Sequence, residues 1–160
     1  IVPSDVDETV DRVLPPSEHV LEIARRKTHA VAKQFQNELI LGADTVVALQ
    51  DEILEKPRDE NHAHQMLIQL SGQTHQVYTA LVLIDTENQR ERTDVVATDV
   101  IMRDLSDEDI SRYVATGEPL DKAGAYGVQG RASIFINSIS GCFYNVVGLP
   151  LASFWTLYIR

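Results

Sequence analysis

The spacing of apolar residues predicts a first helix directly after Pro15-Pro16. Ser17 is a suitable N-cap, and Glu18 in the first turn favours the helix dipole. Apolar residues then recur at helical spacing and predict one buried face, made of Val20, Leu21, Ala24, Val31 and Phe35. Lys27 lies at the edge of this stripe, where a lysine usually extends its charge to solvent. Residues 1–16 are polar and predict a loop.

In the next segment, residues 39–57, the first half is a nearly continuous apolar and β-branched run. This composition predicts a strand buried on both faces, followed by a turn at residues 50–52 and a returning strand. Asp44 interrupts the run, and burial of a carboxylate costs several kcal/mol unless it is paired, hydrogen-bonded or metal-bound. A structural Asp that caps a backbone turn is one interpretation. The return of Lys56 to the same hairpin favours the other, a site for a metal–phosphate substrate.

The middle of the chain, residues 59–117, predicts two more helices and a long hairpin. One helix begins at Asp59, runs through Leu70 and ends at Gly72. Residues 75–85 and 90–104 are rich in β-formers and are joined by a polar turn, which predicts an antiparallel hairpin. Ser106 and Asp109 predict a capping box for the helix that ends at Gly117.

The last third of the chain contains a glycine-rich loop, residues 117–130, and loops of this length in compact domains are usually functional or disordered. Its alternation of polar and small apolar residues favours an ordered loop. We expect a short hairpin over residues 132–139 and then a final amphipathic helix that carries Leu151, Phe154, Trp155 and Leu157 and places its aromatic residues in the core. The order of elements predicts a single α/β or α+β domain.

Composition narrows the class of protein. A chain of 160 residues with 44% hydrophobic residues supports one sizeable core, with two lobes at most. A net charge of −10 argues against duplex nucleic acid or an anionic membrane as partner. One cysteine, Cys142, excludes an internal disulfide and a multi-cysteine zinc site, which fits a cytoplasmic protein. We find no secretory signal and no apolar run long enough to span a membrane.

Three groups of residues are candidates for chemistry. Glu8 and Asp44 could hold a hard divalent cation through oxygen, as magnesium prefers when it also binds substrate phosphates. Lys27 and Lys56 could neutralise those phosphates.

The glycine-rich loop supplies the third group, Asp121, Lys122 and Gln129. The Gln129 amide both donates and accepts hydrogen bonds, so it could recognise the edge of a nucleobase. The sequence contains no P-loop, dinucleotide fingerprint, Gly-x-Ser-x-Gly elbow or His-Glu-x-x-His motif. The residues alone therefore support only a phosphate-site hypothesis.

Several short motifs occur together, and their order and spacing are those of a known family: Gly42-Ala-Asp-Thr-Val-Val47, Glu55-Lys-Pro57, Leu70-Ser-Gly72, Asp121-Lys-Ala-Gly-Ala-Tyr-Gly-Val-Gln-Gly130 and Val147-Gly-Leu-Pro-Leu151. In this combination the chain resembles, over essentially its whole length, the Maf family of nucleoside triphosphate pyrophosphatases, which is associated with septum formation. The resemblance implies a two-lobed α/β fold with a mixed twisted sheet flanked by helices. That fold is similar to the inosine triphosphate pyrophosphatases, with a nucleotide in the cleft between lobes.

The resemblance also implies an activity and roles for the candidate residues. The expected reaction is hydrolysis of a nucleoside triphosphate to the monophosphate and pyrophosphate, assisted by magnesium, manganese or cobalt. Carried over by motif, Asp44 is the metal ligand or the base that activates water, and Glu8 is the second acidic ligand. Lys27 and Lys56 correspond to phosphate-neutralising lysines, and Thr45 and Gln129 to base-contacting residues. The loop at 121–130 is similar to the branch acting on dTTP, UTP and modified uridine nucleotides, and a homodimer is a further expectation.

One departure from the family pattern carries an expectation of its own. Family members open with a strand and a Ser-x-Ser-x-Arg-Arg loop that cradles phosphates, and this sequence begins after it. We therefore expect residues 1–160 to form one Maf-like domain with an exposed sheet edge and weak or absent hydrolysis. Two other functions stay open: a nucleotide-binding regulator of cell division that acts without turnover, and a metal-dependent phosphatase that releases single phosphates.

Overall fold

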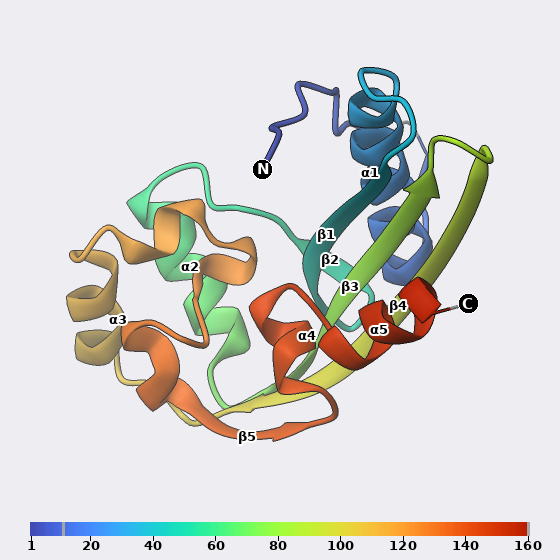
Figure 1. Ribbon diagram of the computed structural model, residues 1–160. Helices are drawn as coiled ribbons and strands as arrows, with labels where there is room; N and C mark the ends of the chain where they lie inside the picture. Colours follow the sequence, from blue (N-terminus) through green and yellow to red (C-terminus); the bar gives the residue numbers. More distant parts are fainter. Residues whose placement is uncertain (11, 160) are drawn as a thin grey trace.

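A computed structural model of the protein describes residues 1–10 and 12–159 (Figure 1). A five-stranded sheet in the order β2-β1-β3-β4-β5 runs through it, and every pairing among these strands is antiparallel. The strands are β1 (Leu39–Leu49), β2 (Glu52–Leu54), β3 (Thr74–Asp85), β4 (Arg90–Met102) and β5 (Ile136–Ser140). The predicted hairpin of the third and fourth strands is confirmed.

The β1–β2 turn is also as predicted. Gln50 and Asp51 both adopt positive φ, 51° and 70°, as the two central residues of a tight hairpin turn do. β2 is short and pairs with β1 only at Val47, Ala48 and Leu49. Among the described strands, residues 39–46 of β1 therefore have a neighbour on one side only, β3. This leaves the edge of β1 open beside Asp44.

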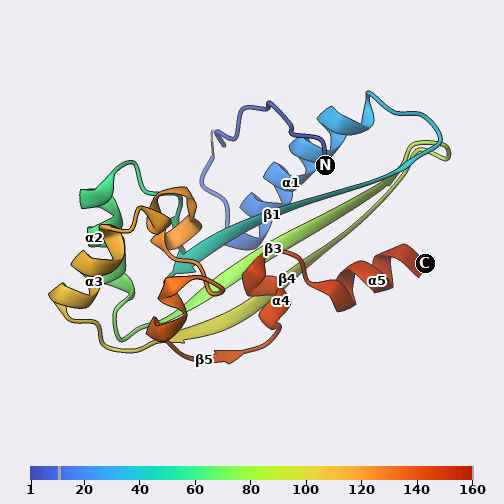
Figure 2. The same cartoon turned by 60° about the vertical axis from the view of Figure 1, so that its left-hand side comes forward.

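Helices cover both faces of the long strands, as Figure 2 shows. Helix α1 (Pro16–Ala32) lies on one face, and the short α4 (Phe143–Val147) and α5 (Leu151–Ile159) lie on the other. The core under α1 consists of Val20, Ala24, Val46, Ala80, Val82 and Ile84. On the opposite face Leu157 of α5 packs on Leu81 and Leu83 of β3. Alternate residues of β3 thus belong to different cores, as the pleat of a strand requires.

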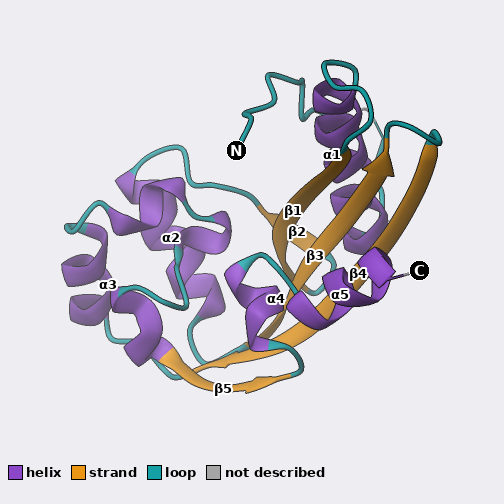
Figure 3. Cartoon of the chain, in the orientation of Figure 1, coloured by secondary structure: helices purple, strands orange, loops and turns teal. Residues whose placement is uncertain are grey.

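A second lobe forms at the other end of the sheet, where Figure 3 shows the helices gathered. It contains α2 (Glu60–Leu70), α3 (Asp107–Val114) and the 3-10 turns η1 (Glu118–Asp121), η2 (Ala123–Ala125) and η3 (Arg131–Phe135). The Asp59 side chain caps α2, and Ser106 and Asp109 form the predicted capping box of α3. The α/β class and the two-lobed arrangement are confirmed.

Two expectations for the first helix are wrong. Its N-cap is Pro15, whose carbonyl accepts from the backbone N–H groups of Glu18 and His19, so Ser17 lies inside the helix and caps nothing. The pyrrolidine ring of Pro16 suits a first helical position, so the helix begins at Pro16, nearer the N-terminus than expected. Phe35 lies beyond the end of α1 and is 36% exposed.

Three further expectations fail because tertiary packing decides both the burial of side chains and the pairing of strands. β1 is fully buried only at residues 46–48, and Leu39 near its free edge is 52% exposed. Residues 132–139 do not form a hairpin, because the chain passes from η3 into β5, which pairs with β4. On α5, Trp155 is 59% exposed and only Leu157 is fully buried.

Gly42 sets the distance between α1 and β1. A Cβ at this position would lie 1.8 Å from Oγ1 and 2.9 Å from Cβ of Thr28, which is itself buried and donates to the Ala24 carbonyl. We therefore expect Gly42→Ala to lower the free energy of unfolding by about 1–3 kcal/mol, as overpacked cores do. Urea unfolding monitored by circular dichroism measures this change.

The companion variant Gly42→Ala/Thr28→Ala tests the cause. It removes Oγ1 but keeps the Thr28 Cβ contact at 2.9 Å, so Gly42→Ala should cost less stability in the Thr28→Ala background than in the parent. Strictly additive losses in the double variant would show that the two residues do not compete for space.

Candidate functional site

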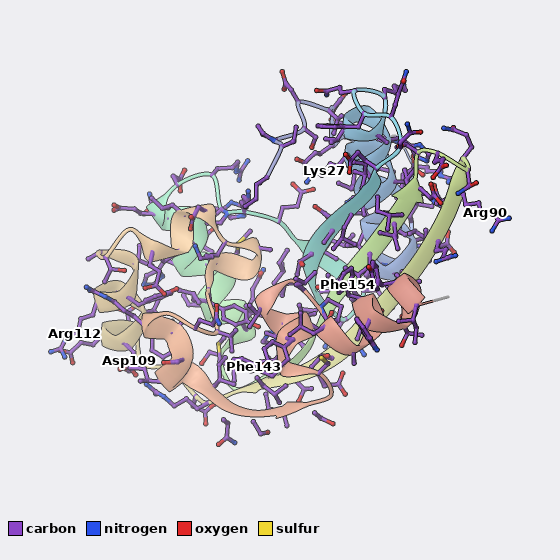
Figure 4. The ribbon with its side chains drawn as sticks, in the orientation of Figure 1. Lys27, Arg90, Asp109, Arg112, Phe143 and Phe154 are labelled. Atoms are coloured by element: carbon purple, nitrogen blue, oxygen red, sulfur yellow. The ribbon has the colours of Figure 1, made fainter. Side chains whose placement is uncertain are left out.

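Asp44, Lys27 and Glu8 meet at the open edge of β1. The Lys27 Nζ, which projects from α1 (labelled in Figure 4), lies 2.7 Å from Asp44 Oδ1 and 2.9 Å from Glu8 Oε2. The side chains of Lys27 and Asp44 are only 22% and 14% exposed, whereas that of Glu8 is 60% exposed. One ammonium group is thus shared by a buried and an exposed carboxylate.

This arrangement shifts the pKa values of both Asp44 and Lys27. Burial raises the pKa of Asp44, and the nearby Glu8 adds to this effect, while Lys27 opposes it. For Lys27, burial by itself would lower the pKa, but the hydrogen bonds to Asp44 and Glu8 prevail and raise it. The lysine therefore stays charged, and Asp44 is a more basic carboxylate than an exposed aspartate.

The segment that carries Glu8 has no regular secondary structure and is tied to α1 by an arginine. Nη1 of Arg26 donates to the Thr9 carbonyl at 2.7 Å and to the Asp7 carbonyl at 3.3 Å. The Asp7 carboxylate in turn accepts from the backbone N–H of Thr9. Arg26 and Lys27, adjacent on α1, therefore hold the loop and its carboxylate respectively. Sequence reasoning did not identify Arg26 as a residue that positions the site.

Two cavities adjoin at this edge of the sheet. The first, of about 610 Å³, contains Glu8, Lys27 and Asp44 in its wall. The second, of about 310 Å³, is bounded by the glycine-rich loop and by apolar residues of the sheet and α4. Thr45, Lys56 and Ala123 line both cavities. A ligand could therefore extend from the charged cavity into the more apolar one without leaving the protein surface.

The glycine-rich loop is ordered, as expected, and two of its glycines lie in close contact with other side chains. Gly124 has φ +64°, donates its N–H to the Glu55 carbonyl, and leaves no room for a Cβ, which would lie 2.9 Å from Val47 Cγ1. The Glu118 carboxylate fills the space at Gly130, where a Cβ would lie 2.0 Å from Oε1. Glu118 also accepts from the Arg131 N–H at 2.9 Å. The loop is therefore anchored to the β1–β2 hairpin and to its own beginning.

All eight residues expected at the site lie around these two cavities. Glu8, Lys27 and Asp44 line the charged one, Asp121, Lys122 and Gln129 line the loop side, and Thr45 and Lys56 lie between them. Lys122 pairs with Asp121, so its ammonium is partly neutralised.

Several residues of the site carried no signal in the sequence. His19 lines the charged cavity, Glu118 accepts from the Arg131 N–H, and Thr79 is hydrogen-bonded to Thr45. Glu118 is a common acidic residue after a helix, and Thr79 lies inside an ordinary β-rich run. Only the folded arrangement gives these side chains a role.

The acidic pair is compatible with a divalent cation. Two carboxylate oxygens already converge on one cationic centre, the Lys27 ammonium, and oxygen donors of this kind suit magnesium or manganese. Within residues 1–10 and 12–159 no cluster of three or more His, Cys, Asp or Glu side chains is placed to bind a metal. A cation at Asp44 and Glu8 would thus need further ligands from water or substrate, as magnesium commonly does when it binds with phosphates.

Comparison with known proteins agrees with the motifs. The family model described as Maf-like protein matches residues 1–159. Among curated relatives, the "dTTP/UTP pyrophosphatase" of Escherichia coli (strain UTI89 / UPEC) is 54% identical over 141 residues, or 88% of this chain and 71% of the relative. The protein of that name from Photorhabdus laumondii is 53% identical over 137 residues, covering 85% of this chain and 69% of the relative. The "Nucleoside triphosphate pyrophosphatase" of Shigella flexneri is 52% identical over 141 residues, with coverage of 88% and 71%.

In the part of the chain that the structure describes, no helix combines the length and apolar character needed to cross a bilayer. The motifs, the two-lobed architecture, the family match over residues 1–159 and relatives more than half identical all agree. The chain belongs to the Maf family.

Proposed function

We propose that this protein hydrolyses nucleoside triphosphates to the monophosphate and pyrophosphate, with dTTP, UTP and modified uridine nucleotides as substrates. The observation that carries the proposal is the joining of a charged cavity, containing Asp44, Glu8 and Lys27, to an apolar cavity beneath the glycine-rich loop. Triphosphate and base need these two environments side by side. The names of relatives that are 52–54% identical support the reaction and the substrates.

The arrangement suggests a division of labour among the residues. Asp44, whose pKa is raised, would accept the proton of the attacking water as it adds to the α-phosphorus. The bond to the bridging oxygen then breaks, and pyrophosphate leaves. Lys56 and Lys27 would offset the negative charge of the phosphates, and these are the two lysines in the wall of the charged cavity. Gln129 and Thr45 would contact the base.

Asp44 and Glu8 are the residues that would hold a divalent cation, with magnesium, manganese or cobalt as candidates. When bound, such an ion supplies charge neutralisation at the phosphoryl oxygens and a more acidic water. Lys27 would then exchange its carboxylate contacts for contacts with phosphate. We also propose that the domain acts as a homodimer.

Pyrophosphate release from dTTP, UTP, CTP, ATP and GTP tests the proposal. The assay is run with each of the three metals, and orthophosphate is measured in parallel. We expect dTTP and UTP to be used in preference to the other nucleotides, with pyrophosphate and no orthophosphate as the first product. The E. coli relative, assayed alongside, controls for the conditions.

The other outcomes are equally specific. Orthophosphate as the first product would identify a phosphatase. Nucleotide binding without turnover, both by this chain and by this chain preceded by the N-terminal segment of the E. coli relative, would identify a nucleotide-binding regulator if the relative is active under the same conditions.

A further inference from the structure

A chain of hydroxyl groups runs beneath the floor of the apolar cavity. Thr45 on β1 and Thr79 on β3 are direct cross-strand partners, and their Oγ1 atoms are 2.8 Å apart. Thr79 Oγ1 also lies 2.9 Å from the carbonyl oxygen of Asn145 on α4. Thr79 and Asn145 are completely buried, whereas Thr45 lines the cavity.

The direction of these hydrogen bonds follows from proton counting. A carbonyl oxygen can only accept, so the single Thr79 hydroxyl proton must point to Asn145. The opposite orientation would set two oxygen lone pairs against each other at 2.9 Å inside the protein. Thr45 must therefore donate its own proton to Thr79. Its hydroxyl is left with lone pairs only for a ligand.

Asn145, which accepts the last hydrogen bond of this series, is itself held in place by several hydrogen bonds. Its Nδ2 donates to the Val77 carbonyl and to Thr98 Oγ1, both at 2.9 Å, which ties α4 to β3 and β4. Its carbonyl oxygen also accepts from the backbone N–H of Gly148. Gly148 has φ +110°, and a Cβ there would lie 3.4 Å from Thr45 Oγ1, so glycine keeps space beside the hydroxyl. The hydrogen bonds of Thr79 and Asn145 thus fix the orientation of the Thr45 hydroxyl.

We propose that Thr79 is a positioning residue that makes the Thr45 hydroxyl an obligate hydrogen-bond acceptor and so selects pyrimidine bases with a hydrogen on ring nitrogen N3. Uracil and thymine present an N3–H donor, whereas N3 of cytosine is an acceptor and would face the lone pairs of Thr45. The inference rests on the proposed function, because it takes the base to lie in the apolar cavity. It adds a residue that touches no substrate and a reason for the choice of base.

The test compares the ratio of kcat/KM for UTP to kcat/KM for CTP in three proteins: the parent chain, Thr79→Val and Thr79→Ser. In Thr79→Val the Thr45 hydroxyl loses its acceptor and can rotate to donate to cytosine N3. We expect the UTP/CTP ratio to fall about tenfold, mainly through a lower KM for CTP. Thr79→Ser keeps the hydroxyl and should keep the parent ratio. Thermal melting shows whether each variant is folded.

The ratio separates positioning from mere structural support. A Thr79→Val protein that is slower on both nucleotides by the same factor, with an unchanged ratio, would overturn the inference and leave the proposed function intact. A parent that hydrolyses UTP and CTP equally well would overturn the inference and the expected preference for dTTP and UTP, but not the proposed release of pyrophosphate. A parent that neither binds nor hydrolyses any of the nucleotides, while the E. coli relative does, would overturn both proposals.

Discussion

Asp44→Asn is expected to lower kcat for UTP by at least about 100-fold while leaving UTP bound, because the amide cannot accept the proton of the attacking water. Folding should not suffer. Burial raises the pKa of Asp44, so the neutral amide removes the cost of a buried carboxylate, and the Lys27 ammonium, which loses this partner, still pairs with Glu8. Pyrophosphate release gives kcat, and isothermal titration with a non-hydrolysable UTP analogue gives Kd.

Asp51→Asn is the matched control for this substitution. Asp51 lies in the exposed β1–β2 turn with φ 70°, a conformation that asparagine readily adopts, so kcat should remain at the parent value. An Asp44→Asn protein that keeps more than about a tenth of the parent kcat would show that Asp44 is not the base. Its thermal melting temperature, equal to or above that of the parent, distinguishes lost chemistry from lost structure.

The second large effect is a loss of stability in mild acid caused by His75. This histidine is 1% exposed, its Nε2 lies 2.7 Å from the Tyr126 hydroxyl, and its Nδ1 has no hydrogen-bond partner among the described residues. Burial lowers its pKa from 6.5 to about 4. Tyr126 lines the apolar cavity, so this pair also supports the site.

The sign of the effect follows from the two pKa values. Above pH 6.5 His75 is neutral in both states and contributes no pH dependence. Between pH 6.5 and about 4 the unfolded chain binds a proton that the folded chain excludes, so the free energy of unfolding falls as the pH falls. At about 1.4 kcal/mol per pH unit, His75 accounts for a loss of about 3 kcal/mol by pH 4.

His75→Gln should flatten this slope, because the amide can still contact Tyr126 but does not titrate in this range. Urea unfolding at half-unit steps between pH 7 and pH 4 measures the difference between variant and parent. His62→Gln is the control, since His62 is only partly buried, forms no ion pair among the described residues and should leave the His75 slope in place. Parallel pH profiles for His75→Gln and the parent would refute the assignment.

Features of the chain that depend on near neighbours in sequence were predictable. The capping box at Ser106 and Asp109, the turn at residues 50–51 and the termination of α2 involve contacts across only a few residues. Their energies depend on local backbone conformation, which residue type largely determines. Six of the eight candidate site residues lie in short motifs with distinctive spacing, so the sequence could propose them, whereas Glu8 and Lys27 lie outside these motifs.

Burial at the ends of elements was not predictable by the same means. Periodicity states which side of a helix or strand is apolar, but it does not state how much of that side a neighbour covers. Trp155 and Leu39 belong to apolar patterns, yet both remain over half exposed because no described element packs fully over them. The start of α1 was misplaced for a different reason, since Pro16 is compatible with a first helical position as well as with the loop before it.

The sequence by itself determined the class of fold, the order of most elements and the residues that bear charge at the site. Only the tertiary structure decided how those residues are oriented: Lys27 between Asp44 and Glu8, Gly42 against Thr28, and Thr45 hydrogen-bonded to Thr79, 34 residues away. Contacts of this kind depend on the register of β1 with β3 and on the distance between α1 and the sheet. Both are set by the packing of the whole core, and a shift of one residue in register would turn Thr45 away from Thr79.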